Sequence, residues 1–354
     1  MKMTLRWFGE NQDKVTLRQI AQIPGVDGVV TSFLDIPAGE VWPLERIKAM
    51  KGQVSASGLN VEVIESVNIH EDIKLGLPSR DKYIDNYIAT LKNLREIGIK
   101  VICYNFMPVL DWARSKLFYE LPDGSKTMFY DDAEIMSLTP EDLLKAFQDQ
   151  SDKYEMPGWE PERLKSMAET IKKYDGMTEE RFMGNMKYFL DRIIPYCEEY
   201  DIKMAIHPDD PPWPIFGLPR LIVNRDNIRR FLDLNSSPYN GLTLCTGSIG
   251  ANRVNDVPAI ISEFAAEGRI HFAHIRNLRF VSDRSFYESA HLTSCGSLDI
   301  YAIVKALHDN GFTGYIRPDH GRMIWGETGR AGYGLYDRAL GAAYINGIWE
   351  ALSR

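Results

Sequence analysis

Eight short apolar runs recur along this chain, and each is rich in the β-branched and aromatic residues that favour strands. Segments in which apolar residues recur at helical spacing separate the runs. A repeated strand and helix is typical of a parallel sheet covered by helices, which leaves few architectures open. The eight predicted strands cover residues 5–9, 28–33, 61–66, 100–106, 203–208, 242–247, 270–277 and 315–320.

The number and spacing of these strand–helix units favour a closed barrel. Helical periodicity is clear over residues 84–94, 182–197 and 300–307, and Cys197 shares the apolar face of its predicted helix. Eight units of roughly 30 to 45 residues each predict an α/β fold of the (β/α)8 TIM-barrel type. A doubly wound open sheet is the alternative, but no glycine-rich turn follows the first strand. We therefore expect Cys197 in the core of a barrel.

Residues 107–178 interrupt the repeat after the fourth strand. This stretch is rich in acidic, aromatic and proline residues and carries turn signals such as LPDGS and MPGWE. Insertions at the carboxyl ends of barrel strands commonly form lids or subunit contacts. We expect an insertion of that kind within a single barrel domain that covers residues 1–354.

Composition excludes several classes of partner. The 354-residue chain has a formal net charge of −8 and scatters its lysines and arginines, so no nucleic-acid partner is expected. The first nine residues lack the apolar core of a signal peptide, and no apolar run approaches the roughly 20 residues of a membrane span. The four cysteines form no CxxC pair, as expected of reduced thiols. A cytoplasmic protein with no membrane partner is predicted.

The last four predicted strands end in residues that bind metals. They end in AIHPDD, LCTGS, AHIRN and RPDHG, which puts His207, Cys245, His274 and Asp319 at comparable positions. Strand ends converge on one mouth in a closed barrel. Two imidazoles, a thiolate and a carboxylate suit a divalent transition metal, and the two anions would neutralise its charge. Each residue alone is more often a core or paired residue, but four at matching positions predict a metal site.

His271 competes with His274 for the third ligand position. The sequence HFAH places the two three residues apart, on opposite faces of a strand, so one of them points inward. His274 is chosen because it is nearer the end of the strand. His70, His291 and His308 are interpreted as solvated loop or helix residues, although His70 and His291 are close enough to strand ends to line a pocket.

The stretch YIRPDHGRMIWG, residues 315–326, places several charged and polar side chains at the end of the last strand. Asp319 and His320 are the first pair of catalytic candidates there, because polar side chains at the end of a barrel strand are typically functional. The competing interpretation is an ion pair between Arg317 and Asp319 with His320 as a surface histidine.

Together these motifs resemble the mannonate dehydratase family. The resemblance rests on RWFG, VIES-x-x-IHEDIK, VICYNFMPVLDW, KMAIHPDDPP with FGLPR, LCTGS, AHIRN, RPDHGR-x-IWG and GYGLYDRALGA, which together extend over nearly the whole length. It implies a xylose-isomerase-like barrel that removes water from D-mannonate to give 2-keto-3-deoxy-D-gluconate in hexuronate breakdown. The sequence departs from the family pattern only in the insertion and at residues 279–286.

The resemblance also implies a metal and a set of site residues. The metal is divalent, with Mn²⁺ or Fe²⁺ first and Co²⁺ or Zn²⁺ as alternatives. Its implied ligands are the same four strand-end residues, and catalysis is assigned to His320 and to Tyr333 of GYGLY. The family precedent further implies a homo-oligomer, a dimer or larger.

Dehydration of a sugar acid requires a base for the proton beside the carboxylate and an acid for the departing hydroxyl. His320 and Tyr333 fit these two tasks, and the sequence leaves open which residue does which. A tyrosine base would need a phenol pKa well below about 10. Arg276, Asn277 and Arg322 are candidates for holding the substrate's carboxylate and hydroxyls, and Arg276 and Asn277 could instead support the ligands.

Two other functions remain open at this point. A barrel of this kind could isomerise or epimerise a sugar or sugar acid with the same metal and a carboxylate base. A sugar-acid sensor is the non-enzymatic alternative, but no signalling or DNA-binding segment is recognisable.

Overall fold

A closed parallel barrel of eight strands forms the centre of the computed structural model, which describes residues 1–139, 141–142, 145 and 167–354. The strand order around the barrel is β1-β12-β9-β8-β7-β4-β3-β2, and every neighbouring pair is parallel. This confirms the predicted barrel and excludes the open sheet. The barrel strands are β1 (Lys2–Arg6), β2 (Gly28–Thr31), β3 (Asn60–Glu65), β4 (Val101–Tyr104), β7 (Lys203–Ile206), β8 (Asn240–Cys245), β9 (Ile270–Ile275) and β12 (Tyr315–Pro318).

All eight predicted strands are present with somewhat different limits, and the limits of the first differ most. It was expected over residues 5–9 but begins at Lys2 and ends at Arg6. The reason is long-range pairing, because Lys2 and Met3 lie opposite Tyr315 and Ile316 of β12 at the closure of the barrel. A partner so distant in sequence cannot be seen in a local pattern.

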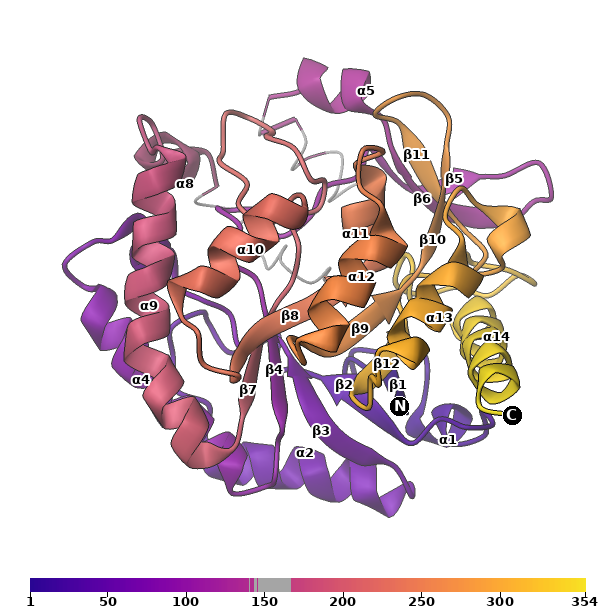
Figure 1. Ribbon diagram of the computed structural model, residues 1–354, viewed down its shortest axis with the longest axis horizontal. Helices are drawn as coiled ribbons and strands as arrows, with labels where there is room; N and C mark the ends of the chain where they lie inside the picture. The colour runs from indigo at the N-terminus through magenta and orange to yellow at the C-terminus, as the bar shows by residue number, and fades with distance from the viewer. Residues whose placement is uncertain (140, 143–144, 146–166) are drawn as a thin grey trace.

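Helices surround the barrel on its outer face (Figure 1). Their burial follows the predicted apolar stripes. In α9, for example, Thr178 caps the first turn by accepting from the Arg181 amide, and Cys197 is fully buried as predicted. The longer helices are α2 (Leu44–Ala56), α4 (Arg80–Arg95), α9 (Glu179–Tyr200), α10 (Arg225–Leu234), α12 (Val257–Ala266), α13 (Ile300–Asp309) and α14 (Tyr336–Leu352).

Shorter helices occupy the loops. They are α1 (Leu17–Ile20), α3 (Glu71–Leu75), α5 (Asp132–Ser137), α8 (Met167–Lys173), α11 (Thr246–Ala251) and the 3₁₀ turn η1 (Thr293–Cys295). Among the described residues, no helix combines the length and apolar character needed to cross a membrane.

The interior of the barrel has an apolar layer with a polar layer above it. The apolar layer includes Val30, Val101, Ala205, Phe272 and Tyr315. Side chains alternate in and out along a strand, so the next inward residues lie one layer closer to the carboxyl ends. The candidate site is built on that upper layer.

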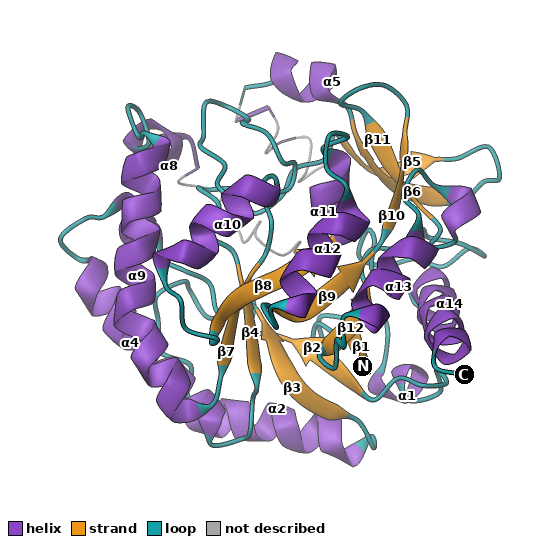
Figure 2. Cartoon of the chain, in the orientation of Figure 1, coloured by secondary structure: helices purple, strands orange, loops and turns teal. Residues whose placement is uncertain are grey.

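A second sheet of four antiparallel strands stands beside the barrel (Figure 2). Its order is β10-β11-β6-β5, and β11 pairs with β6 through Phe286 opposite Tyr130. The sheet therefore joins the start of the 107–178 insertion to the segment that follows β9. Its strands are β5 (Lys116–Glu120), β6 (Lys126–Tyr130), β10 (Asn277–Phe280) and β11 (Phe286–Ser289).

Candidate active site

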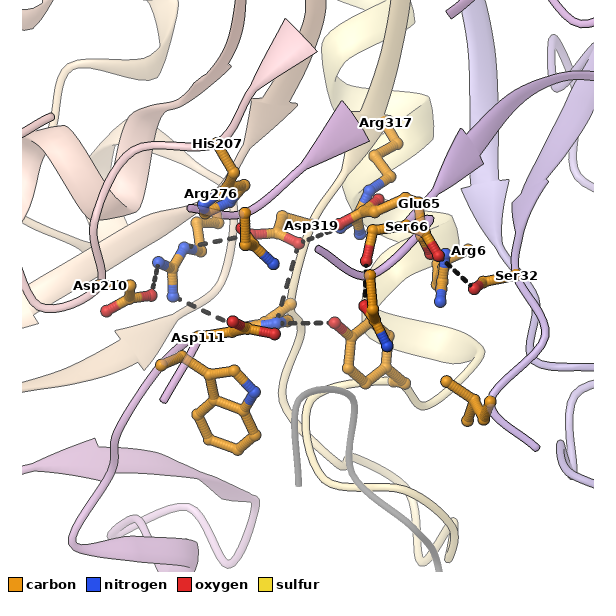
Figure 3. A pocket seen from close by; sticks show the side chains of 16 residues that line it. Arg6, Ser32, Glu65, Ser66, Asp111, His207, Asp210, Arg276, Arg317 and Asp319 are labelled. Carbon is orange, nitrogen blue, oxygen red and sulfur yellow. Dashed lines mark hydrogen bonds and ion pairs between the residues drawn. The ribbon is translucent and has the colours of Figure 1, made fainter. Parts of the chain in front are cut away.

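A cavity opens at the carboxyl ends of the barrel strands and encloses about 630 Å³ of empty space, including its mouth (Figure 3). Residues of β1, β3 and β12 and residues that follow β2, β4, β7 and β9 line it, and Asp111 and Trp112 of the insertion form part of its wall. Polar and charged side chains predominate in the lining. The cavity is thus suited to a small polar ligand.

The four candidate ligands come together at this cavity. Donor atoms of His207, Cys245 and His274 all lie within 4.8 Å of one another. Asp319 completes the group, because its Oδ2 is 3.6 Å from Cys245 Sγ and its Oδ1 is 4.0 Å from His274 Nδ1. The four residues come from the ends of consecutive strands around the barrel, β7, β8, β9 and β12.

The electrostatic environment favours the anionic, metal-binding forms of Cys245 and Asp319. Burial alone would raise the pKa of the Cys245 thiol, but Arg276 and the neighbouring imidazoles of His207 and His274 hold it well below its usual value. Asp319 is also buried, yet Arg317 and the surrounding cationic groups keep its pKa well below the normal range. A thiolate and a carboxylate therefore face two imidazoles.

Unpartnered polar atoms test whether this group fits a metal. Neither ring nitrogen of His274 has a hydrogen-bond partner among the described residues. In His207, Nδ1 lies 2.7 Å from the Pro208 carbonyl oxygen and donates to it, which leaves Nε2 as a lone-pair donor. Buried polar atoms without partners need an explanation, and a divalent transition metal supplies one.

His320 and Tyr333 form a hydrogen-bonded pair on the wall of the cavity. His320 Nε2 is 3.0 Å from the Tyr333 hydroxyl, and His320 Nδ1 is 2.9 Å from Glu288 Oε1. A carboxylate only accepts, so Nδ1 carries the proton and Nε2 accepts from the tyrosine. Burial raises the pKa of Tyr333, which keeps its phenol protonated. His320 is also buried, so the interpretation as a surface histidine is wrong.

Glu288 belongs to a buried network of two arginines and two carboxylates. Arg114 binds Asp210 through both terminal nitrogens, at 2.8 and 3.0 Å, and binds Glu288 at 2.7 Å. Arg276 contacts the same two carboxylates and also donates to Ser248. Burial favours neutral Glu288, but His320, Arg276 and Arg114 lower its pKa to about 2. The network fixes Glu288, and Glu288 fixes the ring of His320.

This depressed pKa predicts how acid affects stability. The folded pKa of Glu288, about 2, is below the unfolded value, so its contribution is complete above about pH 4.5 and is lost as the pH falls toward 2. The shift corresponds to roughly 3 kcal/mol. We expect the difference in unfolding free energy between wild type and Glu288→Gln, measured by chemical denaturation, to shrink by about that amount over this range. A difference that stays constant would contradict the assignment.

The competing ion pair at the last strand is present as well. Arg317 Nη2 is 2.8 Å from Asp319 Oδ1 and 3.1 Å from Glu65 Oε1. Sequence reasoning missed Glu65 and Arg6 as cavity residues, although VIES ends one of the predicted strands. The rule applied to the last four strands would have found Glu65, had it been applied to all eight.

Two of the three proposed substrate residues lie outside the cavity lining. Arg322 pairs with Asp337 at 3.0 Å and with Asp123 at 3.2 Å. Asn277 is fully buried, and its side-chain oxygen accepts from the Leu278 and Leu298 amides. Both residues therefore stabilise loops, and Arg276 alone of the three lines the cavity.

The remaining histidines are separate from the site. His271 lies at the other end of β9, where burial and nearby cationic side chains lower its pKa to about 3. His70 caps α3 by accepting from the Asp72 amide and stacks on Tyr83. His291 is buried, contrary to the expectation of a solvated loop residue.

Comparisons with known proteins agree over the full length. The family model described as D-mannonate dehydratase (UxuA) matches residues 1–354. Mannonate dehydratase from Thermotoga neapolitana is 59% identical, covering 100% of this chain and 98% of the relative, and that from Lactococcus lactis subsp. cremoris is 56% identical, covering 100% and 99%.

Solved structures agree with the sequence relatives. The crystal structure of mannonate dehydratase from Streptococcus suis serotype 2 superposes with a TM-score of 0.90 at 44% identity, covering 100% of this chain and 95% of that chain. A xylose isomerase-like TIM barrel protein from Mycobacterium smegmatis, 14% identical with a TM-score of 0.53, covers 96% of this chain and 88% of its own and shares the fold alone. The chain belongs to the D-mannonate dehydratase (UxuA) family.

Proposed function

We propose that this chain removes water from D-mannonate to give 2-keto-3-deoxy-D-gluconate, at a divalent metal held by His207, Cys245, His274 and Asp319. The observation that carries the proposal is the convergence of these donors beside the His320–Tyr333 pair in one cavity. Relatives named mannonate dehydratase, identical at 56–59% of positions, support the choice of substrate and reaction.

A metal bound to these ligands supplies electrostatic stabilisation for the negative charge that develops on the substrate carboxylate. The residues around the metal have to transfer two protons: one is removed from C2, and one is delivered to the departing hydroxyl. Glu288 holds the proton of His320 on Nδ1, so Nε2 is an acceptor suited to remove the proton from C2. Tyr333 presents a protonated phenol 3.0 Å away, suited to deliver a proton to the departing C3 hydroxyl. The geometry favours His320 as base and Tyr333 as acid.

Arg276 and Arg317 take different parts in this proposal. The terminal nitrogens of Arg276 are engaged with Asp210 and Glu288, and its Nε is 3.2 Å from Asp319 Oδ2. It therefore stabilises the anionic ligands and does not bind substrate. Arg317 lines the cavity, and its Nε and Nη1 have no hydrogen-bond partner among the described residues. Arg317 is the better candidate for attracting the substrate carboxylate.

The 107–178 insertion is proposed as part of the cavity rim in a single-domain chain. Asp111 and Trp112 line the cavity, and Arg114 forms an ion pair with Glu288. The part of the expected lid at residues 140, 143–144 and 146–166 lies outside the described residues. A homo-oligomer in the cytoplasm remains our expectation, and sedimentation of the purified protein measures the number of subunits.

Product analysis tests the function directly. Protein stripped with a chelator and reloaded with Mn²⁺ or Fe²⁺ should convert D-mannonate into a 2-keto-3-deoxy acid, and the stripped sample should not. Formation of the C2 epimer or a ketose would instead support an isomerase or epimerase. Binding without any product would support a sensor.

Cys245 allows a prediction about metal preference. Thiolate is a softer ligand than carboxylate or water, so it favours Fe²⁺, Co²⁺ and Zn²⁺ over harder ions. We expect Cys245→Ser to weaken binding of these three ions more than binding of Mn²⁺, as measured by chelator competition. Equal losses for all four ions would count against direct coordination by Cys245.

A further inference from the structure

Glu65 ends strand β3 inside the polar layer below the candidate ligands. Its Oε1 is held by Arg317 Nη2 at 3.1 Å, and Arg6 Nη1 donates to its backbone carbonyl. Two arginines therefore hold Glu65 in place. Glu65 is a fixed carboxylate in the lining of the cavity.

The second carboxylate oxygen of Glu65 faces one nitrogen of His274. Glu65 Oε2 lies 3.4 Å from His274 Nε2, and neither atom has a closer hydrogen-bond partner among the described residues. The other ring nitrogen, Nδ1, faces Asp319 Oδ1 at 4.0 Å. The two nitrogens of one imidazole thus face two different carboxylates.

A continuous chain of charges connects two of the proposed ligands. Arg317 Nη2 contacts both Asp319 Oδ1, at 2.8 Å, and Glu65 Oε1 (Figure 3). Through Arg317 the position of Glu65 is coupled to that of Asp319, and through Oε2 it is coupled to His274. A ligand histidine commonly donates its second N–H to a carboxylate, which fixes the tautomer and the ring plane.

We propose that Glu65 is a positioning residue for His274: it accepts a hydrogen bond from the Nε2–H group and thereby leaves Nδ1 as the nitrogen that binds metal. The inference rests on the proposed metal centre and adds to it a residue outside the four ligands. It makes Glu65 responsible for metal affinity without direct coordination.

A different role for Glu65 is also conceivable on geometric grounds. Donor atoms of Glu65, Cys103 and His274 lie within 4.8 Å of one another, so they could form a second ligand group. Burial raises the pKa of Cys103 well above its usual value, and a protonated thiol is a poor ligand. The two roles predict opposite nitrogens of His274 on the metal.

Nitrogen NMR of the histidine rings separates these roles. Chelator-treated full-length protein with ¹⁵N-labelled histidine is loaded with Zn²⁺ alone, and His274 is identified by comparison with His274→Gln. We expect zinc on Nδ1 and a proton on Nε2. Zinc on Nε2 would overturn the proposal in favour of the Glu65, Cys103 and His274 group.

Metal affinity provides the second readout, which does not depend on activity. Loss of a carboxylate that orients a ligand typically costs 10- to 100-fold in affinity. Glu65→Gln should therefore weaken Zn²⁺ binding by about 10-fold or more. The matched control Glu62→Gln changes the same residue type in the same strand, where Glu62 pairs with exposed Lys2, and should bind Zn²⁺ as wild type does.

The outcomes distinguish this inference from the metal centre itself. Wild-type affinity in Glu65→Gln, with zinc bound by the unmodified chain, would overturn the role of Glu65 and leave the four ligands standing. Failure of the unmodified chain to bind zinc or any other divalent transition metal would overturn the metal centre, and the role of Glu65 with it.

Discussion

Replacing His320 by asparagine should lower kcat by about 10²- to 10⁴-fold, the range for removing a general base. Asparagine keeps a polar side chain near Glu288 but cannot remove a proton from carbon. Since Nδ1 of His320 is held by Glu288 and Nε2 faces Tyr333, the change should leave bound metal and fold intact. Turnover of D-mannonate, metal content and circular dichroism are the measurements.

The partner variant Tyr333→Phe should cause a loss of similar size, and isotope exchange separates the two roles. In deuterated water, a variant that lacks only the acid can still exchange the C2 proton, whereas a variant that lacks the base cannot. We expect exchange in Tyr333→Phe and none in His320→Asn. The reverse result would make Tyr333 the base and His320 the acid. Near-normal turnover in either variant, or loss of metal from His320→Asn, would refute the catalytic assignment of both residues.

Removing any one of three ligands should abolish metal and activity together. His207→Ala, His274→Ala and Asp319→Ala each leave an under-coordinated ion, so bound metal per chain should fall steeply. Elemental analysis after gel filtration measures this directly.

The Asp319 variant needs a matched control for stability. Asp319 is buried against Arg317 and Arg276, so alanine there leaves two buried cations with one anion fewer. Asp319→Asn keeps the shape and should still lose metal. His308→Ala, at a partly exposed histidine on α13, should retain it. Full occupancy in all three alanine variants would refute the ligand set.

The sequence predicts the barrel and the gathering of the candidate ligands for the same reason. Parallel strands in a closed barrel end at one face, so side chains at matching strand ends converge whatever the details of the loops. His207, Cys245 and His274 follow this rule, and His274 was chosen over His271 because it is nearer the end of the strand. Apolar patterns and strand ends can be recognised from neighbouring residues in the sequence, so both could be predicted.

The residues that sequence reasoning missed depend on long-range pairing. Glu288 reaches His320 only because β11 pairs with β6 of the insertion, and neither strand was predicted. Arg322 was a candidate for holding the substrate, yet Asp337 of α14 binds it outside the cavity. Which carboxylate an arginine meets depends on the packing of distant segments, and a single sequence carries no direct signal for that.

We expect one divalent metal to be bound where the four strand ends meet. Anomalous diffraction from crystals of the Mn²⁺-loaded protein tests this most directly, because the signal locates the ion independently of activity. We expect one strong peak within coordination distance of His207, Cys245, His274 Nδ1 and Asp319. No peak there, or a peak at another position in the cavity that these residues do not reach, would contradict it.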